Sequence, residues 1–438
     1  MRQYAYDIVY GTLEMNKHSD ELFHGVLRDN PFLEQKQKSF LKRLSFGTIE
    51  RAIEMDARID QFSKIPTAKM EPPVRTVLRM ALYEICYMEQ VTEAAACHEA
   101  VKLVREKAGE RPTGFVNGIL REYLRHRDEV AIKETWQKLS VPKELFDHFV
   151  SRYGIKTAKK IAGSFLDKSG EVTIHLDKNK ISADDYDLLL EREGIAWRKG
   201  VYWEEARILS HVPDVRLLPG YEKGLFFVQD ESSMLPVACA GIKPGDVVVD
   251  ICSAPGGKSI HALTELAGRG RLIARDVSGQ KVELVKENIR RMGYNNVSAQ
   301  VWDARRPDTE MAEKADVILA DVPCSGIGII GRKPEIKYHA MENAGELAAL
   351  QREICEASLS ILKPGGVFIY STCTINRAEN EENVQWLESR FGLERESLDC
   401  YLPEPLCNRM TAGGMLQMLP GIQESDGFFV ARLRKKAM

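Results

Sequence analysis

The spacing of apolar residues divides the 438-residue chain into three parts. From residue 1 to about 130, apolar residues recur every three or four positions, which predicts helices throughout. From about residue 226 to the end, short apolar runs alternate with helical spacing, which predicts a parallel sheet with helical crossovers. Residues 131–225 mix the two patterns. We therefore expect a multidomain protein with an all-α domain at 1–130, a small α+β module at 131–225 and an α/β domain at 226–438.

Composition narrows the class of protein. Hydrophobic residues make up 44% and charged residues 29% of the chain, as in ordinary soluble globular proteins. The formal net charge of −3 excludes a wholesale polyanion binder, so any contact with nucleic acid must come from local basic patches. The nine cysteines form no Cys-x-x-Cys pair, and no apolar run reaches membrane-spanning length. We expect a monomeric, cytoplasmic protein without a metal site or a membrane span.

One stretch, Val247–Lys258, is expected to carry a cofactor. An apolar run leads to Asp250 and then through a Pro-Gly-Gly turn into a helical stretch, so the loop lies at the sheet edge where α/β proteins bind ligands. A P-loop would need a glycine where Cys252 stands, and the Gly-x-Gly-x-x-Gly of dinucleotide sites is missing. The loop therefore suits a nucleoside without phosphates, such as S-adenosylmethionine. The candidate cofactor residues of the loop are Asp250, Cys252, Ser253, Ala254, Pro255, Gly256, Gly257 and Lys258.

Acidic residues end several predicted strands of the C-terminal domain. After the strand that ends at Asp250, strands are expected at Leu272–Asp276, Val297–Asp303, Asp316–Asp321 and Gly366–Ser371. Asp276 is expected to accept hydrogen bonds from the ribose hydroxyls, and Asp303 to meet the adenine amino group. One such acid could equally cap a helix or lie solvated at a strand end. The set, in register after successive strands, favours a nucleoside pocket that also includes Asp321.

Two cysteines follow the last two predicted strands. Cys324 lies in Asp-Val-Pro-Cys-Ser-Gly and Cys373 in Ser-Thr-Cys-Thr, so both thiols are expected at the carboxyl edge of the sheet, beside the cofactor. Cysteine is most often a small buried apolar residue. That role fits poorly for two cysteines in polar loops at adjacent strand ends, and we expect them to take part in the chemistry together with Asp321.

Three segments of the N-terminal domain are distinctive: Leu78–Glu84, His98–Val101 and Gly114–Gly118. They resemble the NusB family of RNA-binding helical proteins, and the resemblance implies a helical fold that faces RNA. Basic residues could meet phosphates there and elsewhere in the chain, although a solvated surface is an equally good interpretation of each group. They are Lys102, Arg105, Lys107, Arg111, Arg121, Arg125, His126, Arg127, Arg332, Lys333 and the tail Arg432–Lys436.

The C-terminal domain resembles the RNA cytosine-C5 methyltransferases, which have a Rossmann-like fold and use S-adenosylmethionine. The motifs are Asp250–Lys258, Asp321–Gly326 and Ser371–Thr374. Supporting segments are Gln229–Ser233, Gly331–Ile336, Glu379–Asn383 and Asp426–Phe429. One departure is Val322, where the family usually has alanine. Together with the NusB-like N-terminus, the chain is similar to bacterial enzymes of this family that methylate a cytosine of 16S ribosomal RNA.

The resemblance implies a role for each residue of the candidate catalytic site. Cys373 would be the nucleophile that adds to C6 of the base, Cys324 would assist release, and Asp321 would contact N3 or the amino group. Chemistry alone leaves the attacking cysteine open, because DNA cytosine methyltransferases use the Pro-Cys cysteine, here Cys324. A non-catalytic RNA-binding factor and a nicotinamide oxidoreductase are alternative functions. The complete set of acids and cysteines argues against the first, and the missing dinucleotide motif argues against the second.

Overall fold

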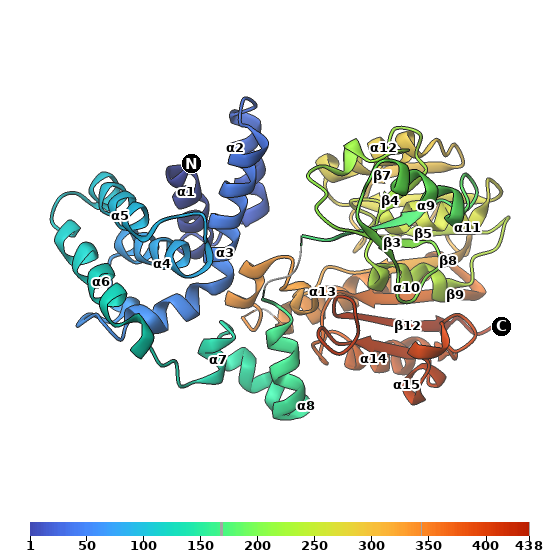
Figure 1. Ribbon diagram of the computed structural model, residues 1–438. Helices are drawn as coiled ribbons and strands as arrows, with labels where there is room; N and C mark the ends of the chain where they lie inside the picture. The colour runs from blue at the N-terminus through green and yellow to red at the C-terminus, as the bar shows by residue number, and fades with distance from the viewer. Residues whose placement is uncertain (167–169, 343, 438) are drawn as a thin grey trace. The chain divides into compact units, whose positions relative to one another are not determined.

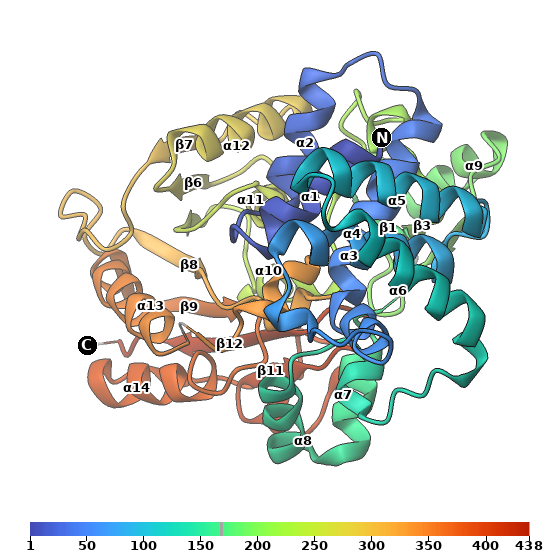
Figure 2. The same cartoon turned by 90° about the vertical axis from the view of Figure 1, so that its left-hand side faces the viewer.

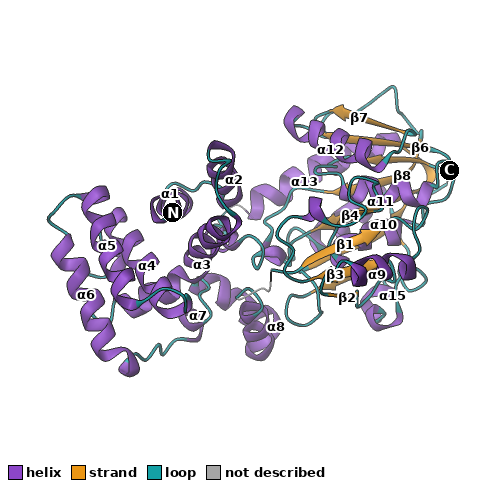
Figure 3. Cartoon of the chain, turned by 45° about the horizontal axis from the view of Figure 1, so that its top comes forward, coloured by secondary structure: helices purple, strands orange, loops and turns teal. Residues whose placement is uncertain are grey.

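A computed structural model describes residues 1–166, 170–342 and 344–437. The chain forms two compact units. The helical unit comprises Met1–Asp167 and a distant segment, Ile330–His339, and the other unit comprises Lys168–Ile329 and Ala340–Met438. Strands occur only in the second unit among the described residues, as the orange arrows of Figure 3 show. No helix in the described part of the chain has both the length and the apolar character to cross a membrane.

Eight α-helices lie in the described part of the helical unit (Figure 1). Six lie within the first 130 residues, where the apolar spacing predicts helices: α1 (Arg2–Leu13), α2 (Ser19–Asp29), α3 (Gln35–Ile59), α4 (Pro72–Tyr87), α5 (Glu93–Ala108) and α6 (Thr113–His126). The other two, α7 (Thr135–Lys138) and α8 (Lys143–Gly163), belong to this unit although the sequence places them in the α+β module at 131–225. The apolar faces of α1 to α6 meet in one core that includes fully buried Leu44, Val77 and Leu120. Figure 2 turns α4, α5 and α6 toward the viewer.

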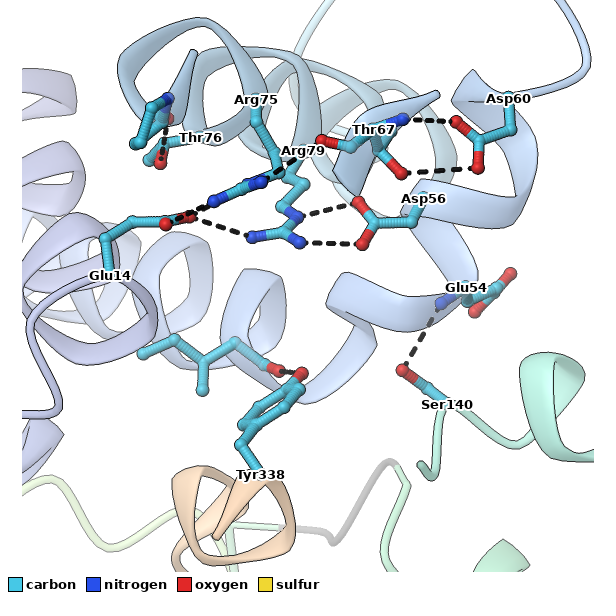
Figure 4. A network of polar contacts seen from close by, with 12 residues as sticks. Glu14, Glu54, Asp56, Asp60, Thr67, Arg75, Thr76, Arg79, Ser140 and Tyr338 are labelled. Carbon is cyan, nitrogen blue, oxygen red and sulfur yellow. Dashed lines mark hydrogen bonds and ion pairs between the residues drawn. The ribbon is translucent and has the colours of Figure 1, made fainter. Parts of the chain in front are cut away.

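Arginines of α4 hold the first helices together (Figure 4). Arg79 makes a bidentate pair with Asp56 of α3, at 2.7 Å from Nε and 2.6 Å from Nη2. Arg75 donates to Glu14, which directly follows α1, over 3.0 Å. Planar guanidinium groups suit such two-pronged contacts with carboxylates. These ion pairs therefore hold α1, α3 and α4 together in addition to their apolar packing.

The segment Ile330–His339 packs within the helical unit although the rest of that unit ends 163 positions earlier in the chain, at residue 167. Its 3₁₀ helix η5 (Pro334–Tyr338) places Tyr338 Oη 2.6 Å from the carbonyl oxygen of Ile49, and Lys337 donates to the carbonyl of Glu50. The Lys337 side chain is almost fully buried, and burial lowers its pKa to about 7. This placement could not be predicted, because no residue pattern separates the segment from the α/β domain on either side of it.

The second unit begins with a four-stranded antiparallel sheet in the order β2-β3-β1-β4. Its elements are β1 (Val172–Leu176), α9 (Ala183–Arg192), β2 (Trp197–Lys199), β3 (Ala206–Leu209) and β4 (Phe226–Val228). Ser182 caps α9 through the backbone N–H of Asp185, as its position before early acids predicts. A fully buried arginine of β3, Arg207, pairs with Asp187 of α9.

The large sheet has the strand order β10-β12-β9-β8-β5-β6-β7, with β11 paired to β12. The five predicted strands form its parallel part: β5 (Val247–Asp250), β6 (Arg271–Asp276), β7 (Val297–Val301), β8 (Ala315–Asp321) and β9 (Leu362–Thr372). The third ends at Val301, two residues before the expected Asp303. Antiparallel strands β10 (Glu394–Arg395), β11 (Met415–Met418) and β12 (Phe428–Arg434) extend the β9 edge.

Helices cover both faces of this sheet because successive strand residues point to opposite sides. Val248 packs in the core with α10 (Glu231–Ala240), α11 (Gly257–Leu266) and α12 (Gly279–Met292). Val249 packs in the core with α13 (Ala344–Ser358) and α14 (Glu381–Phe391), and the short α15 (Arg409–Ala412) lies near the end of the chain. In a sheet that is covered on both faces, ligands bind at the carboxyl ends of the parallel strands.

Candidate active site

The loop after β5 turns sharply into α11. Gly256 has φ of 107°, a conformation that side chains with a Cβ rarely adopt, and its N–H donates to the carbonyl of Ser253 over 2.7 Å. The helix begins at Gly257, so Lys258 and Ser259 stand in its first turn. Ser259 Oγ donates back to Asp250 Oδ2 over 2.7 Å. The predicted strand–loop–helix is thus present, and its two ends are tied to each other.

Asp250 is fully buried. Burial raises the pKa of its carboxyl group to about 7, against the opposite effect of the hydrogen bond from Ser259. One carboxylate oxygen, Oδ1, has no hydrogen-bond partner among the described residues, and the same holds for the buried hydroxyl of Ser253. Buried polar atoms of native proteins are nearly always paired. Two unsatisfied atoms at one loop are therefore consistent with a polar ligand that completes the site.

Asp276 lies at the end of β6, beside this loop. Its two oxygens accept hydrogen bonds from the backbone N–H groups of Ala254 (3.3 Å) and Ser278 (3.1 Å). Each carboxylate oxygen keeps a further acceptor site for a ribose hydroxyl. Exposed Val277 follows directly and offers an apolar surface to a flat base. The residues present therefore fit a nucleoside cofactor at the carboxyl ends of β5 and β6.

Asp303, the predicted contact of the adenine amino group, has a local partner that the sequence analysis missed. Both of its carboxylate oxygens receive hydrogen bonds from Arg305, at 3.0 Å from Nε to Oδ1 and 2.7 Å from Nη2 to Oδ2. These bonds lower the pKa of Asp303 to about 2. The residue lies in the loop after β7 with its side chain partly exposed, so a ligand would meet an acid that is already paired.

Asp321 ends β8 and forms an ion pair with Lys258, whose Nζ lies 2.6 Å from Asp321 Oδ2. Ser371 of the neighbouring strand β9 donates to Oδ1 over 2.8 Å. Burial lowers the pKa of Lys258, but the carboxylates of Asp321 and Asp250 outweigh it and raise the pKa above its ordinary value. Lys258 is therefore a fixed ammonium beside Asp321, a pairing that no local sequence pattern could predict across 63 positions.

The two predicted cysteines meet. Cys324 Sγ lies 3.3 Å from Cys373 Sγ, at the carboxyl ends of the adjacent strands β8 and β9. The hydrogen bond to Cys373, together with burial, raises the pKa of the Cys324 thiol well above its ordinary value. The Lys258 ammonium also interacts electrostatically with the Cys373 sulfur.

Glu379 and Asn380, which directly precede α14, form hydrogen bonds with these two loops. Both are fully buried. The sequence contained them only as part of a segment shared with the family, and nothing in their spacing assigned them a role. An acidic residue among others at the start of a helix is most often solvated. Only the structure could therefore single out Glu379.

Several basic residues turn out to have structural partners. Arg432 and Arg434 lie in β12 and pair with Glu396. Arg432 is almost fully buried, so its expected contact with RNA is wrong. Ion pairs also engage exposed basic residues of the helical unit. They are Arg105 with Glu110, Lys107 with Asp7, Arg125 with Glu122 and Arg127 with Glu93.

Known proteins resemble this chain over most of its length. The family of 16S rRNA methyltransferases RsmB/F matches residues 239–434, and the NusB family matches residues 1–125. A protein of Bacillus subtilis (strain 168) named "Probable ribosomal RNA small subunit methyltransferase B" is 33% identical over 97% of this chain and 96% of its own length.

Two solved structures share the fold. The crystal structure of a protein named PH0851 superimposes with a TM-score of 0.81 at 21% identity, over 99% of this chain and 98% of that one. NSun6 from Pyrococcus horikoshii, solved with the S-adenosylmethionine analogue SFG, gives a TM-score of 0.59 at 23% identity, over 67% of this chain and 98% of its own. Because the sequence similarity extends over nearly the whole length, the chain belongs to the ribosomal RNA small subunit methyltransferase B family, whose members methylate ribosomal RNA with S-adenosylmethionine.

Proposed function

We propose that the protein methylates C5 of a cytosine in 16S ribosomal RNA through a covalent bond between Cys373 and C6 of the base. The observation that carries the proposal is the thiol pair, 3.3 Å apart, beside the Lys258–Asp321 ion pair. C5 of cytosine is a weak nucleophile. Adding a thiolate at C6 turns it into an enamine carbon, so that one hard step becomes two easier ones.

The first step uses Cys373 and Asp321. The Cys373 thiolate forms a bond to C6, the π pair of C5–C6 moves to C4–C5, and the π pair of C4–N3 moves onto N3, which takes a proton from solvent. Asp321, as a carboxylate paired with an ammonium, is a hydrogen-bond acceptor for the N3–H or the amino group. That contact favours the protonated ring and with it the addition. The target base must leave its stack to be reached.

When bound, S-adenosylmethionine supplies an electrophilic methyl group for C5. The residues that would hold it are those of the β5–α11 loop and Asp276. Afterwards the C5 proton leaves to solvent, its electron pair forms the C5–C6 double bond as the bond between C6 and Cys373 breaks, and N3 returns its proton to solvent. This returns a thiolate at Cys373. The Cys324 thiol, whose sulfur lies 3.3 Å from that of Cys373, can donate a hydrogen bond to the departing sulfur. This is the release role that we assign to Cys324.

Serine variants of the two cysteines test the roles. We expect Cys373→Ser to lose turnover and to trap no RNA adduct, because no thiolate is left to attack C6. Cys324→Ser should accumulate a covalent RNA–protein adduct, because addition proceeds and release slows. Denaturing gels of each variant with S-adenosylmethionine and protein-free 16S RNA give both readouts. An adduct that is lost in Cys324→Ser and kept in Cys373→Ser would reverse the assignment to the alternative, in which Cys324 attacks.

A further inference from the structure

Glu379 is a buried carboxylate with four hydrogen-bond donors around it. Oε2 accepts from the backbone N–H of Ser325 (2.9 Å) and from Gln351 Nε2 (2.9 Å). Oε1 accepts from Ser325 Oγ (2.5 Å) and from Asn376 Nδ2 (3.1 Å). A carboxylate has acceptor sites only, so it fits this set of donors completely. Ser325 is the residue that follows Cys324, and it makes two of the four bonds.

The next residue, Asn380, holds the other cysteine loop. Its Oδ1 accepts from Thr372 Oγ1 over 2.6 Å, and its Nδ2 donates to the carbonyl of Thr374 over 3.0 Å. Thr372 and Thr374 flank Cys373 on both sides. Two consecutive residues therefore hold the two loops, Glu379 the loop of Cys324 and Asn380 the loop of Cys373.

A third contact joins the loops directly and has a definite direction. Ser325 Oγ lies 2.7 Å from Thr374 Oγ1. Ser325 has one hydroxyl hydrogen, and the carboxylate of Glu379 is the stronger acceptor for it. Thr374 must then donate to Ser325, which donates to Glu379. The negative charge of Glu379 therefore orients a chain of hydrogen bonds that runs from the neighbour of Cys373 to the neighbour of Cys324.

We propose that Glu379 is a positioning residue that keeps the two active-site thiols in contact. The importance of that contact for catalysis rests on the proposed two-cysteine function, whereas its effect on thiol separation does not. Glu379 makes no hydrogen bond to either thiol in the described part of the chain, and it holds their loops through Ser325 and Thr374. Shifts of about 1 Å in such supports cost on the order of 100-fold in rate.

Glutamine is the sharpest substitution, because it keeps the size of Glu379 and replaces one acceptor by a donor. An amide NH₂ at the Oε2 position would face the N–H of Ser325 and the NH₂ of Gln351. Gln351 is held in this orientation, since its NH₂ also donates to the carbonyl of Pro323 (2.9 Å) and its oxygen accepts from Asn383 (2.7 Å). At the Oε1 position the NH₂ would reverse the Ser325–Thr374 chain and oppose Asn376. Either orientation loosens the loop of Cys324.

The separation of the thiols can be measured without RNA. Diamide oxidises two neighbouring thiols to a disulfide and takes up the two hydrogens, and peptide mass spectrometry quantifies the Cys324–Cys373 crosslink in the full-length chain. We expect Glu379→Gln to form this crosslink at least tenfold more slowly than wild type. The matched control is Glu382→Gln, the same change three residues later at a partly exposed acid that pairs with Arg377.

Methyl transfer to 16S RNA is measured on the same proteins. We expect kcat of Glu379→Gln to fall at least tenfold with KM for S-adenosylmethionine unchanged, and Glu382→Gln to match wild type. Thr374→Val removes the link between the loops together with a longer hydrogen bond from the Asn376 N–H (3.3 Å), and leaves Glu379 in place. It should show smaller losses in the same direction and covers the case in which Glu379→Gln does not fold. Wild-type crosslinking rates in both Thr374→Val and any folded Glu379→Gln would overturn the proposal. If Glu379→Gln crosslinks slowly but wild type transfers no methyl group, only the proposed function is contradicted.

Discussion

Replacing Asp250 with asparagine should remove a pH dependence from the stability of the α/β unit. The Asp250 carboxyl group is fully buried, and burial raises its pKa from 3.8 to about 7. A raised pKa means that the folded chain binds the proton more tightly than the unfolded chain. The stabilisation is complete below pH 3.8 and is lost as the pH rises through 7.

The size of the effect follows from the shift. Each pKa unit corresponds to about 1.4 kcal/mol, so the shift amounts to about 4 kcal/mol in total. About half of this remains at pH 5.5 and almost none at pH 8.5, so wild type should lose about 2 kcal/mol through Asp250 across that window. Asparagine cannot ionise and should not show this loss. Its NH₂ adds a pH-independent cost at the unpaired position of Oδ1, which cancels in the comparison between the two pH values.

Tryptophan fluorescence suits the assay, because four of the five tryptophans, all but Trp136, lie in the α/β unit. For a domain of this size, 2 kcal/mol corresponds to a change of about 4–8 °C in melting temperature. We expect the melting temperature of wild type, relative to Asp250→Asn, to fall by that amount from pH 5.5 to pH 8.5. Asp184→Asn, at an exposed acid of α9, is the control. Parallel pH profiles of wild type and Asp250→Asn would refute the reasoning.

Three further predictions follow from buried or paired groups. Lys258→Met removes the 2.6 Å ion pair with Asp321 and should lower the initial rate of methyl transfer about 100-fold; a loss below threefold would contradict the role of the pair. Asp187→Ala leaves fully buried Arg207 without its carboxylate and should cost about 3–5 kcal/mol in urea unfolding, whereas a cost under 1 kcal/mol would be contrary to expectation. Tyr338→Phe removes the 2.6 Å hydrogen bond to Ile49 and should destabilise the helical unit by about 1 kcal/mol, followed by circular dichroism; an unchanged transition would show the bond to be dispensable.

Residues close in the sequence were the most predictable part of this protein. The run Val247–Asp250, the glycine turn and the start of α11 followed from apolar spacing and turn chemistry, and the five parallel strands followed from their alternation with helices. The meeting of Cys324 and Cys373 was also foreseeable, because adjacent parallel strands end at one edge.

Contacts between distant side chains could not be predicted in the same way. The ion pair of Lys258 with Asp321 and the hydrogen bond from Ser325 to Glu379 depend on which strands and helices become neighbours. The ion pair of Asp303 with Arg305 is local, yet the sequence alone does not show which of several nearby charged residues Asp303 pairs with. The segment Ile330–His339 leaves the α/β unit without any change in composition that marks the departure.

The central claim, methylation at C5 of cytosine, is tested most directly by the identity of the modified nucleoside. Wild-type protein is incubated with labelled S-adenosylmethionine and protein-free 16S RNA, and the RNA is digested to nucleosides and separated. We predict that the label appears in 5-methylcytidine. Label in any other nucleoside, or no label on free RNA, on assembled small subunits and on transfer RNA alike, would contradict it.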